Sequence, residues 1–220
     1  MKLQVGYCTN VHAGAGWEAA RENLAQHALA VKEAVRPTAT MGVGLWLSAE
    51  AARQLIAGQQ VEAARDWLGD VGLVPFTFNG FPHGDFHQPV VKHRVYHPTW
   101  WEDARRDYTL DLIEIQHAFL PPGMEGSIST LPIAWNKPTP SDAQLRAAAQ
   151  NLAEVADRLA KLEADEGRLI SLCLEPEPGC YLQRSGDIVR FFHDYLLPAG
   201  DEADQTVVYL ISTRPFAASL

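Results

Sequence analysis

Cysteine is scarce in this 220-residue sequence, and its spacing matches no disulfide framework. The chain has three cysteines, Cys8, Cys173 and Cys180, which form no CxxC pair. Such a sparse, odd set favours a reducing compartment over an oxidising one. The N-terminal segment MKLQVGYCTNVHAG also lacks the long apolar core of a signal peptide. We therefore expect a cytoplasmic protein.

Basic charge and long apolar runs are lacking too. The formal net charge is -9, which argues against a nucleic-acid partner, because phosphate binding needs a basic surface. No run approaches the roughly 20 apolar residues of a membrane span. The 47% hydrophobic and 20% charged fractions are typical of a globular protein. We expect one domain over residues 1–220, with no low-complexity linker.

Strand-like segments alternate with helical ones along the chain. Strands are expected at Leu3–Thr9, Met41–Leu47, Val74–Asn79, Gly126–Leu131 and Leu169–Glu175. Helices are expected at Trp17–Val35, Ser141–Glu166 and Gly186–Leu197. A further helical stretch runs from Ser48 to about Gly69 with a break at Gly58, and another ends at Pro121-Pro122-Gly123. Strands separated by helices pair in parallel through right-handed crossovers. This α/β pattern fits a closed barrel or an open doubly wound sheet.

Local signals add detail to two of these helices. In the first, Leu24, Ala28, Val31 and Val35 follow helical spacing and are expected to share one face. Ser141 is a candidate N-cap for the longest helix, and Ser48 is another for the second.

The number of βα units favours an incomplete (β/α) TIM-barrel-type fold. Five units are found, and only Thr206–Ser212 is available as a sixth strand. A complete eight-unit barrel usually needs about 250 residues. We therefore expect five to six units, with part of the barrel absent. The open sheet edges of such a fragment invite self-association, so a homo-oligomer through an edge is expected.

Strand periodicity places a carboxylate at the mouth of the barrel. Ser171, Cys173 and Glu175 share one face of the fifth strand, while Leu172 and Leu174 share the other. Catalytic residues of this fold lie at the carboxyl ends of strands. Glu175 is therefore the leading site residue. The alternative is an ion-paired structural glutamate.

The same periodicity predicts a substrate-binding set around this mouth. It consists of Asn10, Trp46 and Asn79, with Trp135 as a flat face for a sugar ring. Asn10 and Asn79 are alternatively turn residues. Aromatic loop residues such as Trp135 more often anchor their loop.

The segment from Gly80 to Trp101 is too long and too aromatic to be a passive connector. His83 and His87 flank Asp85, and could serve as metal ligands or as a base with its orienting carboxylate. A structural role is the alternative for both histidines. Glu177, held between two prolines, could join Glu175 in acid–base chemistry.

A loose dinucleotide-binding pattern is also present. Gly14, Gly16 and Ala19 follow the first strand in the spacing G-x-G-x-x-A. The first glycine comes several residues after the strand, and no acidic residue ends the second strand. This is the weaker alternative to the barrel.

Four long strings of sequence resemble the EboE metabolite-traffic family. They are GYCTNVHAG, PFTFNGFPHGDFHQPVVKHRVYHPTWW, GSISTLPIAW and LCLEPEPGCYLQRSGDIVRFF, and the likeness covers about residues 1–200. That family is similar in sequence to sugar-phosphate isomerases and epimerases with a xylose-isomerase-like TIM barrel. The resemblance implies a divalent metal ion, Mn, Mg, Zn or Co, at the mouth, with Glu175 as one ligand.

The resemblance also implies ligands that this chain does not supply. Related enzymes take an Asp, a His and a Glu from strands six to eight, whereas the tail TVVYLISTRPFAASL contains none of these residues. The chain is therefore expected to be C-terminally truncated and to lack most of its metal ligands.

Three functions remain open at this point. The first is a metal-assisted isomerase or epimerase acting on a small polar metabolite. The second is a non-catalytic protein that binds and escorts a metabolite in an export pathway. The third is an inactive fragment. Fold alone does not separate them.

Overall fold

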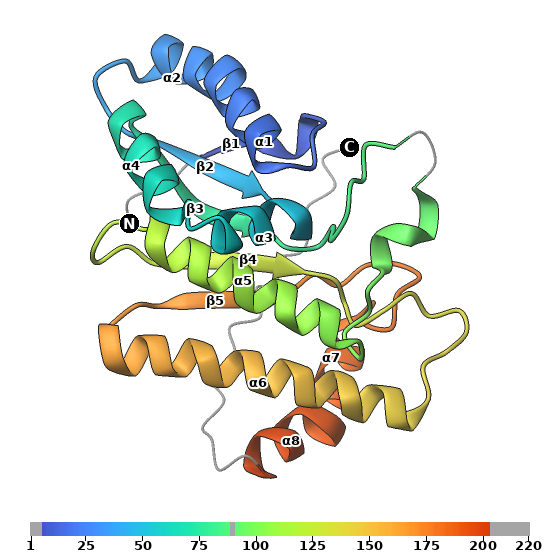
Figure 1. Cartoon of the computed structure of the whole chain (residues 1–220). Coiled ribbons are helices and arrows are strands. Elements are labelled where there is room, and N and C mark those ends of the chain that lie inside the picture. The colour runs from blue at the N-terminus through green and yellow to red at the C-terminus, as the bar shows by residue number, and fades with distance from the viewer. Residues whose placement is uncertain (1–5, 89–90, 203–220) are drawn as a thin grey trace.

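Five parallel strands form a single sheet (Figure 1). The computed structural model describes residues 6–88 and 91–202. The strands are β1 (Gly6–Cys8), β2 (Met41–Trp46), β3 (Leu73–Asn79), β4 (Gly126–Thr130) and β5 (Ile170–Leu174). They lie in the order β1-β2-β3-β4-β5, and every pairing is parallel. The α/β class and all five strands are confirmed, although residues 3–5 of the first expected strand and Thr206–Ser212 lie outside the described residues.

The helices follow the strands one by one. They are α1 (Trp17–Asn23), η2 (Leu24–Ala28), α2 (Leu29–Val35), α3 (Ala49–Ala57), α4 (Val61–Val71), α5 (Asp103–Phe119), α6 (Asp142–Glu166), α7 (Ser185–Phe191), η4 (Phe192–Leu196) and α8 (Leu197–Glu202). Two short turns, η1 (Thr9–Val11) and η3 (Lys92–Tyr96), lie in loops. Helices α3 to α6 lie across one face of the sheet (Figure 1). Their apolar sides and that face share one hydrophobic cluster.

The two faces of the sheet differ in chemistry. The face under the helices is apolar and buried, as at Val43, Leu45 and Ile128. The opposite face, called the inner face below, carries small or polar side chains. One register row across it consists of Cys8, Gly44, Thr77, Ser127 and Ser171. Alternation of side chains along each strand separates these two sets.

Both expected serine caps are confirmed. The Ser48 hydroxyl accepts a hydrogen bond from the Ala51 amide at the start of α3. Ser141 and Gln144 form a capping box at the start of α6. These bonds satisfy amides that a helix leaves without intrahelical partners.

The expected apolar face of the first helix is only half correct. Leu24 is buried, but Val31 and Val35 are 37% and 63% exposed. The segment Leu24–Ala28 is a π-helical turn, and its wider turn rotates the residues that follow it. Lys32 is buried instead, with its stem against Gly72.

The strand order does not favour the dinucleotide-binding alternative. A doubly wound sheet binds dinucleotides where its strand order reverses, and the five described strands contain no reversal. Gly14 instead has a φ of +133° and lies close to Ala19, which belongs to the helix that follows it.

Two further features bear on partners. Over residues 6–88 and 91–202, no helix combines the length and apolar character needed to cross a bilayer. Strands β1 and β5 are the outermost strands of the described sheet. Self-association through an edge stays a prediction.

The capping box of α6 can be tested by substitution. Ser141→Ala should lower the free energy of unfolding by about 1 kcal/mol, because it leaves the Gln144 amide unpaired. Ser141→Asp is the matched control and should retain nearly all stability, since aspartate also caps helices. Urea unfolding followed by circular dichroism measures both. Equal losses in the two variants would contradict a capping role.

Candidate functional site

Glu175 lies directly after β5, at the carboxyl ends of the strands. Its amide donates to the Thr130 carbonyl at 3.0 Å, which continues the ladder by one residue. Its carboxyl is hydrogen-bonded to the Ser129 hydroxyl. Partial desolvation raises the pKa of Glu175, and the nearby Glu177 carboxylate raises it further, while the Ser129 bond lowers it. The side chain remains open to solvent, so a ligand can reach it.

A row of side chains at this end of the sheet leads toward Glu175. The register pairs Trp46 with Asn79, Asn79 with Ser129, and Ser129 with Cys173. Neighbouring strands lie about 4.8 Å apart, so these residues form one line across the inner face. Sequence reasoning found Trp46 and Asn79 but missed Ser129. The alternation in Gly126–Thr130 was the signal that could have found it.

Trp46 is buried beneath the loop after β3. It is 3% exposed, its indole nitrogen donates to the Pro82 carbonyl at 2.9 Å, and Phe86 packs edge-on against it at 4.7 Å. Asn79 accepts a hydrogen bond from the Phe81 amide at 3.0 Å, as a turn residue does. In this structure both residues shape the start of the loop.

His87 brings the same loop onto the end of β1. Its Nε2 lies 2.8 Å from the Asn10 carbonyl oxygen. A carbonyl only accepts, so Nε2 carries the proton. Its Nδ1 is 3.8 Å from Asp85 Oδ1, and neither Nδ1 nor Asn10 Oδ1 has a hydrogen-bond partner among the described residues, although both atoms are buried. Asn10 and His87 thus meet at the end of β1, a contact that the sequence analysis did not predict.

His83 points away from this group. Its carbonyl accepts from the Ala49 amide at 2.8 Å, and its ring packs edge-on against Tyr108 at 5.0 Å. Burial lowers the pKa of His83 to about 4, and the Arg105 and Arg53 cations act in the same direction. His83 is thus a neutral packing residue between α3 and α5, which matches the structural alternative.

Glu177 belongs to a half-buried cluster with Tyr96 and Cys180. The Tyr96 hydroxyl is hydrogen-bonded to Glu177, and Cys180 Sγ lies 3.9 Å from Glu177 Oε2. Burial raises the pKa of Cys180 to about 12, and burial also raises the pKa of Tyr96. Both groups are therefore neutral hydrogen-bond donors that fix the Glu177 carboxylate. Tyr96 and Cys180 were not predicted as site residues.

The described residues do not complete a metal site around Glu175. Within residues 6–88 and 91–202, no three His, Cys, Asp or Glu side chains converge as metal ligands do. Glu175 can supply one ligand. A site with three ligands of this type would need at least one residue from outside these ranges.

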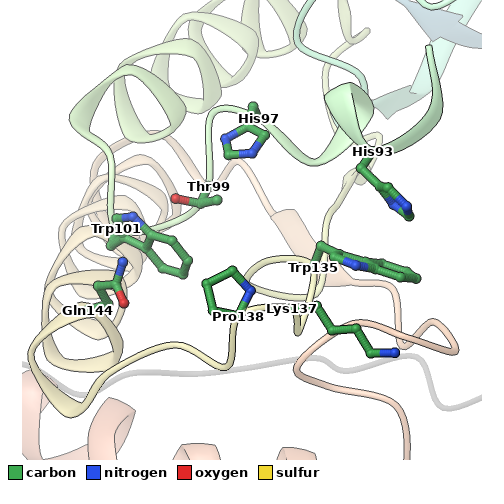
Figure 2. A pocket seen from close by; sticks show the side chains of 8 residues that line it. All are labelled: His93, His97, Thr99, Trp101, Trp135, Lys137, Pro138 and Gln144. Carbon is green, nitrogen blue, oxygen red and sulfur yellow. The ribbon is translucent and has the colours of Figure 1, made fainter. Parts of the chain in front are cut away.

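A pocket of about 430 Å³ opens beside Trp135, between the loops that follow β3 and β4 (Figure 2). Its lining consists of His93, His97, Thr99, Trp101, Trp135, Lys137, Pro138 and Gln144. Trp135 stacks against His93 at 4.4 Å and against Tyr96 at 5.2 Å. Trp135 thus links this pocket to the Tyr96 and Glu177 cluster. Sequence analysis assigned Trp135 to substrate binding and had no means of finding the pocket.

Comparison with known proteins gives no match. No family model, curated protein or solved structure matches the chain. The resemblance to the EboE family therefore stays a prediction, and function has to be argued from the site itself.

The buried state of His83 predicts a pH dependence of stability. Its pKa falls from the ordinary 6.5 to about 4 in the folded chain. As pH falls through this range, the unfolded chain takes up the proton first, so folding loses stability between pH 6.5 and 4. His83→Gln should make the stability fall less steeply over this window in urea unfolding. His193→Gln, which changes an exposed histidine, is the control and should alter the slope less than His83→Gln does.

Proposed function

We propose that this chain forms five βα units of a (β/α)-barrel-type fold and binds a small polar metabolite at the carboxyl ends of its strands. Three features support the fold assignment: strands in sequential order, helices α3 to α6 on one face, and a polar inner face. In (β/α) barrels, ligands bind at the carboxyl ends of strands.

The position of Glu175 carries the proposed chemistry. Its raised pKa brings the carboxyl closer to the pH at which proton transfer is efficient. Isomerisation or epimerisation of a polyhydroxylated metabolite requires a proton to leave a carbon and return to the same or a neighbouring atom. A solvent-accessible carboxyl beside a second carboxylate, Glu177, suits this transfer.

His87 has a positioning role at the opposite edge of the described sheet. Its Nε2 donates to the Asn10 carbonyl and its Nδ1 is buried, so it holds the loop after β3 against the end of β1. Ser129, which is hydrogen-bonded to Glu175, offers a hydroxyl that can orient a hydroxyl of the metabolite.

A divalent cation, when bound, would polarise a carbonyl or hydroxyl of the metabolite. Glu175 is the residue of this chain that would hold it. Because the described residues supply no complete ligand set, the proton-transfer roles proposed here are assigned to side chains alone.

The second candidate function is a carrier that binds a metabolite without converting it. The pocket between Trp101 and Trp135 favours it, because aromatic walls suit retention of a ring (Figure 2). A metal-assisted enzyme and a carrier differ in whether Glu175 holds a metal.

Metal content separates these functions. Metal-assisted chemistry at Glu175 predicts a stoichiometric divalent ion in the purified chain by mass spectrometry, and its loss in Glu175→Gln. Glu163→Gln, which removes an exposed carboxylate on α6, is the matched control and should retain the metal.

Two results would count against metal-assisted catalysis. If none of the three proteins contains metal after supplementation with Mn²⁺, Mg²⁺, Zn²⁺ and Co²⁺, the carrier function is favoured. If all three contain it equally, the ion is bound elsewhere and Glu175 is not a ligand.

A further inference from the structure

The pocket between the loops after β3 and β4 combines aromatic walls with a lining whose ionisable side chains are all basic. Its two ends are formed by Trp101 and Trp135, and Pro138 lies between them (Figure 2). Its volume of about 430 Å³ falls within the range of small-molecule sites. Flat apolar walls suit a ring that lies against an indole face.

The ionisable groups of the lining are all basic. Lys137 and His93 flank Trp135, and His97 lies toward the other side of the pocket. The lining contains no Asp or Glu, in a chain whose formal net charge is -9. The carboxylate of Glu102 borders the lining, 3.6 Å from His97 and hydrogen-bonded to Thr99. Lys137 is exposed, and among the described residues its ammonium forms no ion pair.

A neutral hydrogen-bond donor is also present. The Gln144 side-chain oxygen accepts from the Ser141 amide at 2.9 Å. This bond fixes the amide group, and its nitrogen points toward Trp101 and the pocket (Figure 2). Lys137 thus supplies a cation at the Trp135 end of the pocket and Gln144 a fixed donor at the Trp101 end (Figure 2), and charge-assisted hydrogen bonds of the kind that Lys137 can donate suit a phosphate or carboxylate.

We propose that this pocket binds an organic anion that carries a ring, with the ring against Trp101 and Trp135 and the phosphate or carboxylate near Lys137. The lining of this pocket includes neither Glu175 nor the residues of its row across the inner face. The inference therefore does not depend on the proposed metal-assisted chemistry. Trp135 connects the two regions through Tyr96, which contacts Glu177.

The tryptophan walls give a direct readout. The indole N–H signals of Trp101 and Trp135 can be followed by nuclear magnetic resonance while probes are added to the full chain, with Trp101→Phe used for assignment. The probes are phenyl phosphate, benzoate, inorganic phosphate and benzyl alcohol. Phenyl phosphate or benzoate should shift both signals to saturation, and comparison of the two identifies the preferred anionic group. Inorganic phosphate lacks the ring and benzyl alcohol lacks the charge, so each should bind more weakly.

Lys137→Gln tests the role of charge. It should weaken binding of the better anionic probe about fivefold, the effect expected of one exposed ion pair, and leave benzyl alcohol unaffected. Because Lys137 is exposed, this variant should fold normally. Lys161→Gln removes a lysine of the same charge from α6 that pairs with Asp157, and it should leave binding unchanged.

Three results would overturn the inference. They are the absence of a saturable shift with either ring-bearing anion, binding of benzyl alcohol as tight as that of the anions, and equal weakening by Lys137→Gln and Lys161→Gln. None of these results depends on the metal content of Glu175.

Discussion

All five strands run in the same direction, and the site depends on this constraint. Parallel strands in sequential order bring five carboxyl ends to one edge. Residues as distant in sequence as Asn10, Asn79 and Glu175 therefore follow strands that end at the same side of the sheet. The helices cover one face, which leaves small polar side chains such as Ser127 and Ser129 on the other. The result is a polar, partly open surface next to Glu175, the carboxyl whose pKa is raised.

The long loop after β3 depends on a buried cation. Arg105 is fully buried, and it donates to the carbonyls of Gly80, Phe81 and Pro98 at 2.8 to 3.0 Å. Burial lowers its pKa to about 10, so it stays charged near neutral pH. A buried charge is costly unless hydrogen-bonded, and these three carbonyls offset that cost. Arg105 thereby joins the start and end of the loop that carries both His87 and the lining of the Trp101 pocket.

Much of the fold could be predicted from sequence, because strands, caps and breaks are local signals. The helix cap at Ser141, the helix break at Gly58 and the strand alternation in Ile170–Leu174 all depend on residues close in sequence. The rest depends on contacts between distant residues. No local pattern shows that His83 packs on Tyr108, or that Tyr96 reaches Glu177. The apolar face of the first helix was mispredicted for another reason. A single period of 3.6 residues cannot reveal the extra residue in the π-helical turn at Leu24–Ala28. The EboE resemblance and the metal stay predictions.

The central claim is that partial burial and the Glu177 carboxylate together favour the protonated form of Glu175. Carbon-13 nuclear magnetic resonance of the glutamate side chains, with Glu175→Gln for assignment, measures its pKa directly. We expect a pKa above that of a free glutamate, closer to the ordinary value in Glu177→Gln and higher still in Ser129→Ala, since Glu177 raises it and Ser129 lowers it. A pKa at or below the ordinary value, unchanged by either substitution, would contradict the account.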